Sequence, residues 1–264
     1  MSHADTFHAL HAGPDILVLP NAWDAASAGL MSEAGAKAVA TSSAAVAWAR
    51  GYADGDRLPV ATLLTIIAEA AKASKVPLTA DIEGGYTDDL ATLAETVKGV
   101  VGAGAVGINL EDGLRDPDLH ARKVEAARKA AASAGVNLFI NARTDVYLKG
   151  IAQGEAAVAE STRRAARYQG AGASGIFVPG ARDAGEIKAL VAGIKLPVNI
   201  MGLPGLKAAD LQALGVRRIS SATSLFTAAF GALTRATAAF LADGDSAALY
   251  AAGEGMPNFN KLFG

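Results

Sequence analysis

The sequence predicts an α/β fold, namely a TIM or (β/α)8 barrel, from three observations. Short apolar runs recur about every 30 residues, a helix-like pattern follows most of them, and glycine stands where that pattern ends. With 264 residues, of which 51% are hydrophobic and 19% are charged, the chain can bury a large core. We expect one domain that spans residues 1–264.

The apolar runs have the length and composition of buried parallel strands. The expected strands are Ile16–Leu19, Ala38–Thr41, Leu78–Ile82, Val106–Leu110, Leu138–Asn141, Gly175–Val178, Val198–Met201 and Arg218–Ser220. Eight strands are the number in a TIM barrel. A doubly wound open sheet is the rival architecture, but no Gly-x-Gly-x-x-Gly turn follows the first run, where a dinucleotide-binding fold needs it.

The segments between the runs alternate apolar and charged residues at helical spacing. The expected helices include Leu63–Ala73, Leu93–Val101, His120–Ala132, Ala156–Tyr168 and Glu186–Val191. The helix stop signals are Gly35, Gly104, Gly135, Gly172 and Gly215. C-terminal helices are expected over about residues 222–252, and the apolar stretch Leu225–Leu241 indicates a helix that packs in the core or against a neighbouring subunit.

Charge and composition argue against several functions. The formal net charge is -2, the pI is about 6.1, and no basic stripe is interleaved with aromatic residues, so nucleic acid is not an expected partner. The chain has no cysteine, so a metal would need oxygen or imidazole ligands. No uninterrupted apolar stretch has the length of a membrane span and the N-terminus lacks a signal core, so we expect a cytoplasmic protein without a membrane partner.

Acidic side chains follow two neighbouring runs at the ends where a TIM barrel carries its chemistry. Asp81 and Glu83 are two residues apart and point to the same side, and Glu111 follows the next run. Three carboxylates suit a hard divalent cation, so we expect Mg²⁺ at Asp81, Glu83 and Glu111, with Mn²⁺ as a possible substitute. The alternative is a buried ionic network in which these acids pair with Arg143, Arg50 or lysines.

Two other groups of conspicuous residues have simpler explanations. A mobile N-terminus explains His3, His8 and His11. A solvated helix face explains Arg163, Arg164 and Arg167.

A divalent cation beside an arginine is suited to bind a 2-oxo acid. The metal would chelate the carboxylate and keto oxygens while Arg143 clamps a carboxylate with two hydrogen bonds. Cleavage next to a carbonyl leaves negative charge on its oxygen, and a metal there lowers the barrier by several kcal/mol. The backbone amides of Ser43 and Ala44 would complete the cradle. The segment Gly51–Asp56 is either a lid that excludes water or an ordinary loop.

Seven pieces spread over nearly the whole chain resemble the isocitrate lyase and phosphoenolpyruvate mutase superfamily. They are Asn21–Asp24, Thr41–Ala44, Gly51–Gly55, Ala80–Tyr86, Asn109–Gly113, Asn141–Asp145 and Gly215–Ser220. The resemblance implies a (β/α)8 barrel that uses Mg²⁺ and acts on 2-oxo or 2-hydroxy di- and tricarboxylates or on phosphonopyruvate. It also implies homo-oligomers, dimers or tetramers, in which the C-terminal helix packs on or swaps with a neighbouring subunit.

The resemblance also assigns roles to residues. Asp81 would bind the metal directly, and Glu83 and Glu111 would bind it through water, while Arg143 would hold the substrate carboxylate and Asp54 would lie on a gating loop. The candidate catalytic residues are therefore Arg143, Asp54 and Glu111. The candidate substrate-binding residues are Trp23, Asp24, Ser42, Ser43, Ala44, Arg143 and Asn199.

The chain also departs from the family pattern. Lyase branches carry a Lys-Lys-Cys-Gly-His type loop after the fourth strand, with the cysteine as the acid, whereas the segment Gly113–His120 is shorter and has no cysteine. We expect a Mg²⁺-dependent enzyme that cleaves a carbon–carbon bond in a small 2-oxo or 2-hydroxy dicarboxylate through a metal-stabilised enolate, as a lyase, decarboxylase or oxaloacetate-type hydrolase. The alternatives are a carbon–phosphorus mutase or hydrolase acting on phosphonopyruvate, and a non-catalytic binder of 2-oxo acids.

Overall fold

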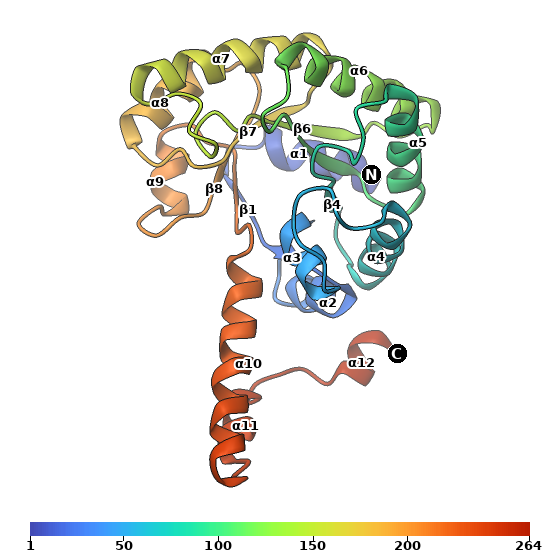
Figure 1. Cartoon of the computed structure of the whole chain (residues 1–264), viewed down its shortest axis with the longest axis vertical. Coiled ribbons are helices and arrows are strands. Elements are labelled where there is room, and N and C mark those ends of the chain that lie inside the picture. The colour runs from blue at the N-terminus through green and yellow to red at the C-terminus, as the bar shows by residue number, and fades with distance from the viewer.

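The computed structural model describes residues 1–264, and its centre is a sheet of nine parallel strands (Figure 1). The strands are β1 (Leu17–Leu19), β2 (Asn21–Ala22), β3 (Val39–Thr41), β4 (Leu78–Asp81), β5 (Gly107–Glu111), β6 (Phe139–Arg143), β7 (Gly175–Val178), β8 (Val198–Met201) and β9 (Arg218–Ser220). Only Pro20 separates β1 from β2. Because β1 pairs with β9 and β2 pairs with β3, the first strand closes the sheet into a barrel. The predicted TIM barrel is confirmed.

Helices surround the barrel and cover the outer faces of most strands (Figure 1). They are α1 (His3–Ala12), α2 (Ala25–Glu33), α3 (Ser43–Ala49), α4 (Val60–Ala73), α5 (Leu90–Gly102), α6 (Pro117–Ser133), α7 (Gly154–Gly170), α8 (Ala184–Gly193), α9 (Ala208–Ala213), α10 (Ser224–Asp243), α11 (Ala247–Ala252) and α12 (Phe259–Phe263). The five predicted helices lie within α4 to α8. Helix-ending glycines take the expected left-handed conformation, with φ of 99° at Gly104 and 101° at Gly172.

Apolar residues form two separate clusters, one on each side of the strands. The larger cluster of 38 buried residues joins outward-facing strand residues such as Ile108 and Ile140 to the helices. The smaller cluster of 6 residues lies inside the barrel, where Phe7 of α1 packs on Phe139 with ring centroids 5.3 Å apart. A Cβ at Gly107 would lie 2.8 Å from the Phe7 ring, so this strand position must be small. The helix α1 thus fills the floor of the barrel.

The N-terminus is ordered, so the expectation of a mobile His-bearing tail is wrong. Ser2 caps α1, and its hydroxyl accepts a hydrogen bond from the Asp5 amide at 3.1 Å. His11 is buried and stacks on Phe139 with ring centroids 4.0 Å apart. Burial and the nearby Arg218 guanidinium lower the pKa of His11 to about 3. The floor of the barrel therefore needs this segment for packing.

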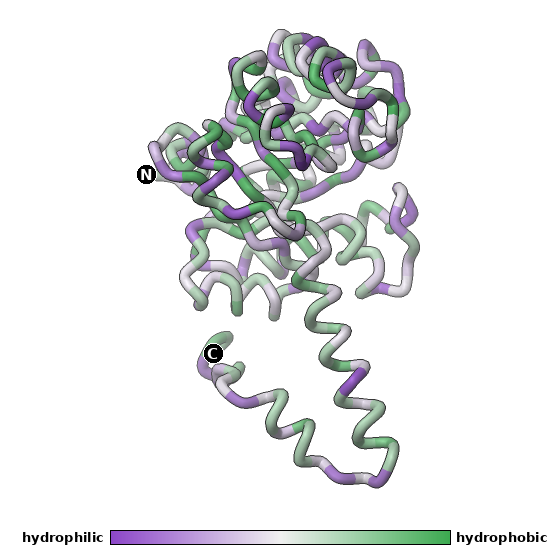
Figure 2. Tube along the Cα trace, turned by 90° about the vertical axis from the view of Figure 1, so that its left-hand side faces the viewer, coloured by the Kyte–Doolittle hydropathy of each residue, from purple (hydrophilic) through white to green (hydrophobic).

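The long helix α10 leaves the barrel instead of packing on it (Figures 1 and 2). Phe226 is its only buried residue, whereas Leu233 is 58% exposed and Leu241 is 77% exposed. By length and composition α10 is apolar enough to cross a membrane, but one such helix is weak evidence for a span. After α10 the chain turns back, and the ring of Phe263 lies against Gly29 of α2. The C-terminal segment is therefore an arm with an uncovered apolar surface.

Candidate active site

The carboxyl ends of β4, β5 and β6 bring three acids and one arginine to the barrel mouth. Glu111 and Arg143 are direct neighbours in the register of β5 and β6, and Arg143 Nη1 lies 2.6 Å from Glu111 Oε2. Asp145 holds the same guanidinium through two hydrogen bonds, from Arg143 Nε at 2.6 Å and from Nη2 at 3.2 Å. Asp81 ends β4 and is mostly buried beside them. The structure therefore brings together Asp81, Glu111 and Arg143, which the sequence places at the ends of predicted strands.

Glu83 lies just beyond β4, where it and two contacting residues have strained, left-handed backbone conformations. It has φ of 51°, and the two residues that bond its carboxylate, Asp56 and Tyr86, have φ of 58° and 61°. The Asp56 amide donates to Glu83 Oε2, and the Tyr86 hydroxyl donates to Glu83 Oε1 at 3.1 Å. Left-handed backbone at a non-glycine residue costs about 1–3 kcal/mol and persists where the surroundings enforce it. Three such residues joined through the Glu83 carboxylate indicate a site built for function.

Negative charge is in excess at this mouth, and the pKa values reflect it. Burial raises the pKa of Glu111 to about 8 against the opposing charge of Arg143, and the charges of Asp81, Asp145 and Glu83 add to the rise. Burial likewise raises the pKa of Glu83 to about 7, with Asp54 and Asp56 adding to the shift. The pKa of Asp81 is raised by burial as well. The acids at this site therefore outnumber the positive charges, and a bound cation would compensate them.

A hard divalent cation is the partner that these oxygen donors fit. No three His, Asp or Glu side chains come close enough to ligate one ion directly, so Asp81, Glu83 and Glu111 do not form a closed ligand cage. Mg²⁺ commonly keeps several waters and takes one or two carboxylates, and this donor set allows that arrangement. The charge excess and the all-oxygen chemistry therefore agree with Mg²⁺.

Comparisons with known proteins identify the family. The family model described as phosphoenolpyruvate phosphomutase matches residues 7–241, which is most of the chain. The chain belongs to this family. The resemblance seen in the sequence is thereby confirmed.

Relatives within and around the family carry more than one activity. The uncharacterized protein Rv1998c of Mycobacterium tuberculosis (strain ATCC 25618 / H37Rv) is 37% identical over 91% of this chain and 90% of its own. A solved structure from Burkholderia cenocepacia J2315, provisionally named a phosphonomutase, is 40% identical with a TM-score of 0.85, covering 88% of this chain and 98% of its own. An oxaloacetate decarboxylase of Rhodopseudomonas palustris (strain HaA2) is 27% identical over 62% of this chain and 59% of its own. Membership thus makes enzyme activity on a small organic acid the coarse expectation, without fixing the reaction.

The loop between α3 and α4 and the short loop after β5 meet over Glu83. Arg115, in the segment that replaces the lyase loop, donates from Nη2 to Asp56 at 2.9 Å and from Nε to Asp88 at 2.8 Å. Lys123 is fully buried and also donates to Asp88, at 2.8 Å. The segment Gly51–Asp56 therefore lies on the site in this structure, where Arg115 binds Asp56.

The remaining predicted substrate-binding residues lie around the same end of the barrel or just below it. Ser42 caps α3, which places Ser43 and Ala44 in the first helical turn, where amides have no partner within the helix. Asn199 is buried inside the barrel and bonds Ser220 at 3.4 Å. Their roles toward a substrate stay predictions.

Two other predicted residues are engaged by neighbouring helices. Asp24 caps α2 through the Ser27 amide at 2.7 Å. Trp23 packs edge-on against Phe226 of α10, with ring centroids 5.2 Å apart. Asp54 is exposed on the loop, and its charge adds to the rise in the pKa of both Asp81 and Glu83.

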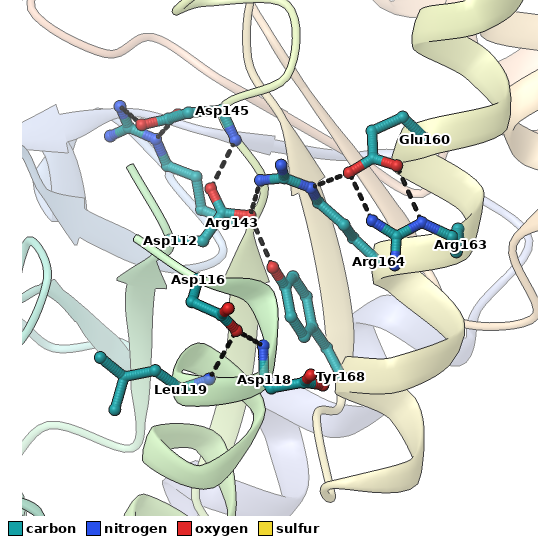
Figure 3. Close-up of polar contacts among 10 residues, drawn as sticks. All are labelled: Asp112, Asp116, Asp118, Leu119, Arg143, Asp145, Glu160, Arg163, Arg164 and Tyr168. Atoms are coloured by element: carbon teal, nitrogen blue, oxygen red, sulfur yellow. Dashed lines mark hydrogen bonds and ion pairs between the residues drawn. The ribbon is translucent and has the colours of Figure 1, made fainter. Parts of the chain in front are cut away.

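The solvated-face interpretation fails for one of the three arginines of α7. Arg164 is buried and binds Asp112, whereas Arg163 has a side-chain exposure of 52% and binds Glu160 (Figure 3). Arg167 pairs with Asp118 near the surface. Arg164 shares the buried face of α7 with Ala157 and Ala165. An arginine at an apolar position of a helix signals a buried partner, and this signal was available in the sequence.

His120, just beyond the short loop after β5, does not serve as a proton donor at the mouth. It is fully buried in α6 and packs edge-on against Tyr168, with ring centroids 4.5 Å apart. Burial lowers the pKa of His120 to about 3. No histidine therefore stands at the site as an acid.

Proposed function

We propose that this chain is a Mg²⁺-dependent enzyme that cleaves a carbon–carbon bond in a small 2-oxo dicarboxylate, with decarboxylation of an oxaloacetate-like substrate as the best-fitting reaction. The excess of buried acid around Arg143 carries the proposal. An anionic substrate would be repelled by Asp81, Glu83 and Glu111 unless a cation stood between them. Mg²⁺ or Mn²⁺ supplies that charge when bound, and acts as a Lewis acid toward the 2-oxo group.

Arg143 is the substrate-binding cation in this proposal. Its guanidinium has five N–H donors, and Asp145 accepts hydrogen bonds from two of them, at Nε and Nη2, while Glu111 forms an ion pair with Nη1. The N–H groups that Asp145 does not use would bind a substrate carboxylate. The first-turn amides of Ser43 and Ala44 point from the N-terminus of α3 and would hold the other carboxylate. Asp54 and the loop around it would exclude water from the bound acid.

The short loop after β5 favours decarboxylation over reversible lyase chemistry. Arg115 stays protonated and is engaged by Asp56 and Asp88, and His120 lies under the loop in the core. Neither Arg115 nor His120 is therefore placed to protonate a departing carbanion. Carbon dioxide leaves without needing a proton, and water can protonate the product afterwards.

A carbon–phosphorus reaction on phosphonopyruvate is the second candidate. The similarity to the Burkholderia structure provisionally named a phosphonomutase favours it. The same acids, Arg143 and a divalent cation would suit this substrate, because it is also a 2-oxo acid with a second anionic group. A non-catalytic 2-oxo acid binder is the outcome if neither reaction occurs.

The deciding experiment measures product formation from oxaloacetate, 2,3-dimethylmalate and phosphonopyruvate, with Mg²⁺ and with EDTA. Oxaloacetate loses carbon dioxide slowly in Mg²⁺ alone, so buffer with Mg²⁺ is the baseline. We expect Mg²⁺-dependent formation of pyruvate from oxaloacetate, faster than in that baseline. A phosphorus resonance shift with phosphonopyruvate would favour the second candidate instead. Metal-dependent binding of a 2-oxo acid by calorimetry without any product would reject the enzyme.

We also propose that the chain acts as a homo-oligomer in which α10 covers a second copy. A groove of about 1000 Å³ lies on the outer wall of the barrel, lined by residues that include Val18, Leu203, Pro204 and Leu225. Val18 of β1 is 59% exposed there, at a place where a barrel strand is normally covered by a helix. An exposed apolar helix of 20 residues and an uncovered strand on the same chain complement each other. Light scattering should give a dimer or tetramer, and Leu233→Asp with Leu241→Asp should shift it toward monomer.

The cytoplasmic location likewise remains a proposal. One exposed apolar helix is better explained by the proposed contact with a second copy than by a bilayer.

A further inference from the structure

Asp112, the residue after Glu111, is a fully buried acid that the reaction itself does not need. Its carboxylate accepts three hydrogen bonds: from the Asp145 amide at 2.9 Å, from Arg164 Nη1 at 2.8 Å and from the Tyr168 hydroxyl at 2.6 Å. Figure 3 shows these bonds running from the end of β6 to α7. A buried carboxylate with this many short bonds fixes the groups around it.

Asp112 also forms hydrogen bonds with the backbone on both sides of Thr144. The Asp112 amide donates to the Arg143 carbonyl at 3.0 Å, and the Asp112 carboxylate receives the Asp145 amide. Asp145 in turn clamps the Arg143 guanidinium through Nε and Nη2. Asp112 therefore sets where Asp145 stands, and Asp145 sets where the guanidinium points.

Arg143 needs such a constraint because several acids compete for it. The charges of Glu111, Asp145 and Asp81 all act on its guanidinium. If Asp145 moved, the guanidinium would turn toward the other acids, and the N–H groups that Asp145 does not use would change direction. A substrate carboxylate bound by two parallel hydrogen bonds is sensitive to that direction.

Arg164 and Tyr168 anchor Asp112 from the outside of the barrel. Both lie on the buried face of α7, four residues apart, so they contact the same acid. Glu160, one turn earlier, accepts from Arg164 Nε at 2.6 Å and keeps that side chain extended. The outer cluster, formed by Asp112, Glu160, Arg164 and Tyr168, thus has a continuous path of contacts to the barrel mouth.

We propose that Asp112, Arg164 and Tyr168 are positioning residues for Arg143, so that the outer helix α7 sets the direction in which the substrate carboxylate is held. The structural part of this inference needs no substrate. Its consequence for substrate binding rests on the proposed function.

The test compares Arg164→Met and Tyr168→Phe with Arg163→Met. Arg163 binds the same Glu160, at 2.7 Å, but does not contact Asp112, so it is a matched control (Figure 3). The first readout is the Nε–H nitrogen NMR resonance of Arg143, assigned by its loss in Arg143→Lys. We expect a sharp resonance in the wild type and in Arg163→Met, and a shifted or broadened one in the other two variants.

The second readout is steady-state kinetics with the substrate that the proposed reaction identifies. We expect Arg164→Met to raise KM about 10-fold with a smaller change in kcat, since an outer partner of a binding group typically contributes about 10- to 100-fold. Arg164→Lys should recover part of the loss, and Arg163→Met should match the wild type. If Arg164→Met does not fold, Tyr168→Phe removes one hydrogen bond without removing a charge and is read in the same way.

The outcomes separate this inference from the proposed function. An unchanged Arg143 resonance in folded Arg164→Met and in Tyr168→Phe overturns the positioning role, whatever the enzyme does. A changed resonance in a protein that binds no 2-oxo acid with Mg²⁺ supports the positioning role and rejects the proposed function. A lower melting temperature with an unchanged resonance and unchanged KM would show that the cluster only stabilises the fold.

Discussion

Two clusters of buried charge lie back to back at the end of β5, and their charges balance differently. The rim cluster, at the barrel mouth, has four acids around one arginine: Asp81, Glu83, Glu111, Asp145 and Arg143. The outer cluster, under α7, has two acids, Asp112 and Glu160, and the buried Arg164, and the half-exposed Arg163 also binds Glu160 at its surface edge. Alternation along an extended chain sends adjacent Glu111 and Asp112 to these opposite sides.

The difference shows how a fold separates support from chemistry. In the outer cluster, hydrogen bonds from Arg163 and Arg164 lower the pKa of Glu160, so that charge stabilises its neighbours. In the rim cluster, burial raises the pKa values of Glu83 and Glu111 into the neutral range. Uncompensated buried charge is costly, so a protein keeps it only where a ligand completes it. A balanced cluster is therefore complete without a ligand, whereas the rim needs one.

The largest expected effect comes from removing a rim acid. Asp81→Asn keeps the size of the side chain but removes a charge that the divalent cation needs. We expect the Mg²⁺-dependent part of kcat/KM to fall about 10³-fold, because the metal provides the main stabilisation of developing charge. Asp89→Asn, at the exposed cap of α5, is the control and should retain activity. Wild-type turnover by Asp81→Asn would remove the rim from the chemistry and leave both clusters as support.

Much of this contrast was predictable from the sequence, and the reason is geometric. Strand ends of a parallel barrel meet at one rim, so Asp81, Glu111 and Arg143 were predictable from their positions after apolar runs. The outer cluster was missed because Arg164 was assigned with its helical neighbours to a solvated face. The left-handed backbone at Glu83 accompanies contacts with Asp56, which is distant in the sequence, and with Tyr86. No sequence pattern predicts this conformation at a glutamate.

The departure of α10 from the barrel could not be predicted from periodicity either. An apolar helix has the same sequence pattern whether its own barrel or another copy covers it. Between β9 and α10, Ala222 has a positive φ of 49°, and the chain turns away from the barrel there. Alanine carries no signal for that conformation, because left-handed backbone usually belongs to glycine or asparagine.

A second prediction contrasts the pH dependence of stability of the two clusters. The folded pKa values of Glu83 and Glu111, about 7 and about 8, exceed the ordinary value of 4.5, so the metal-free folded state binds more protons than the unfolded state. The free energy of unfolding therefore falls as pH rises from about 4.5 to about 8. We expect the melting temperature in EDTA to decrease over that interval, and Mg²⁺ to reduce the decrease because it favours the ionised carboxylates.

Variants assign this pH dependence to its cluster. Glu111→Gln should flatten the upper part of the curve, near the pKa of about 8. Glu160→Gln should leave the slope between pH 5 and pH 8 unchanged, because a lowered pKa contributes stability that is lost only as pH falls below about 4.5. A metal-free melting temperature that stays flat or rises from pH 5 to pH 8 would contradict the unbalanced rim.

The smallest expected effect comes from a third group of charges, which is balanced like the outer cluster but contacts the rim cluster. Arg115 and Lys123 balance Asp56 and Asp88, yet the Asp56 amide also binds Glu83, so this balanced group supports the rim directly. Arg115→Met should loosen residues 51–58 and lower kcat/KM about 3- to 10-fold, since partly exposed ion pairs contribute modestly. Hydrogen exchange of the 51–58 amides measures the loosening. Arg50→Met is the control, because Arg50 pairs only at the surface with Glu69, at 3.7 Å. Equal exchange in the two variants would mean that the loop is held by its own packing, and that Glu83 needs no balanced cluster behind it.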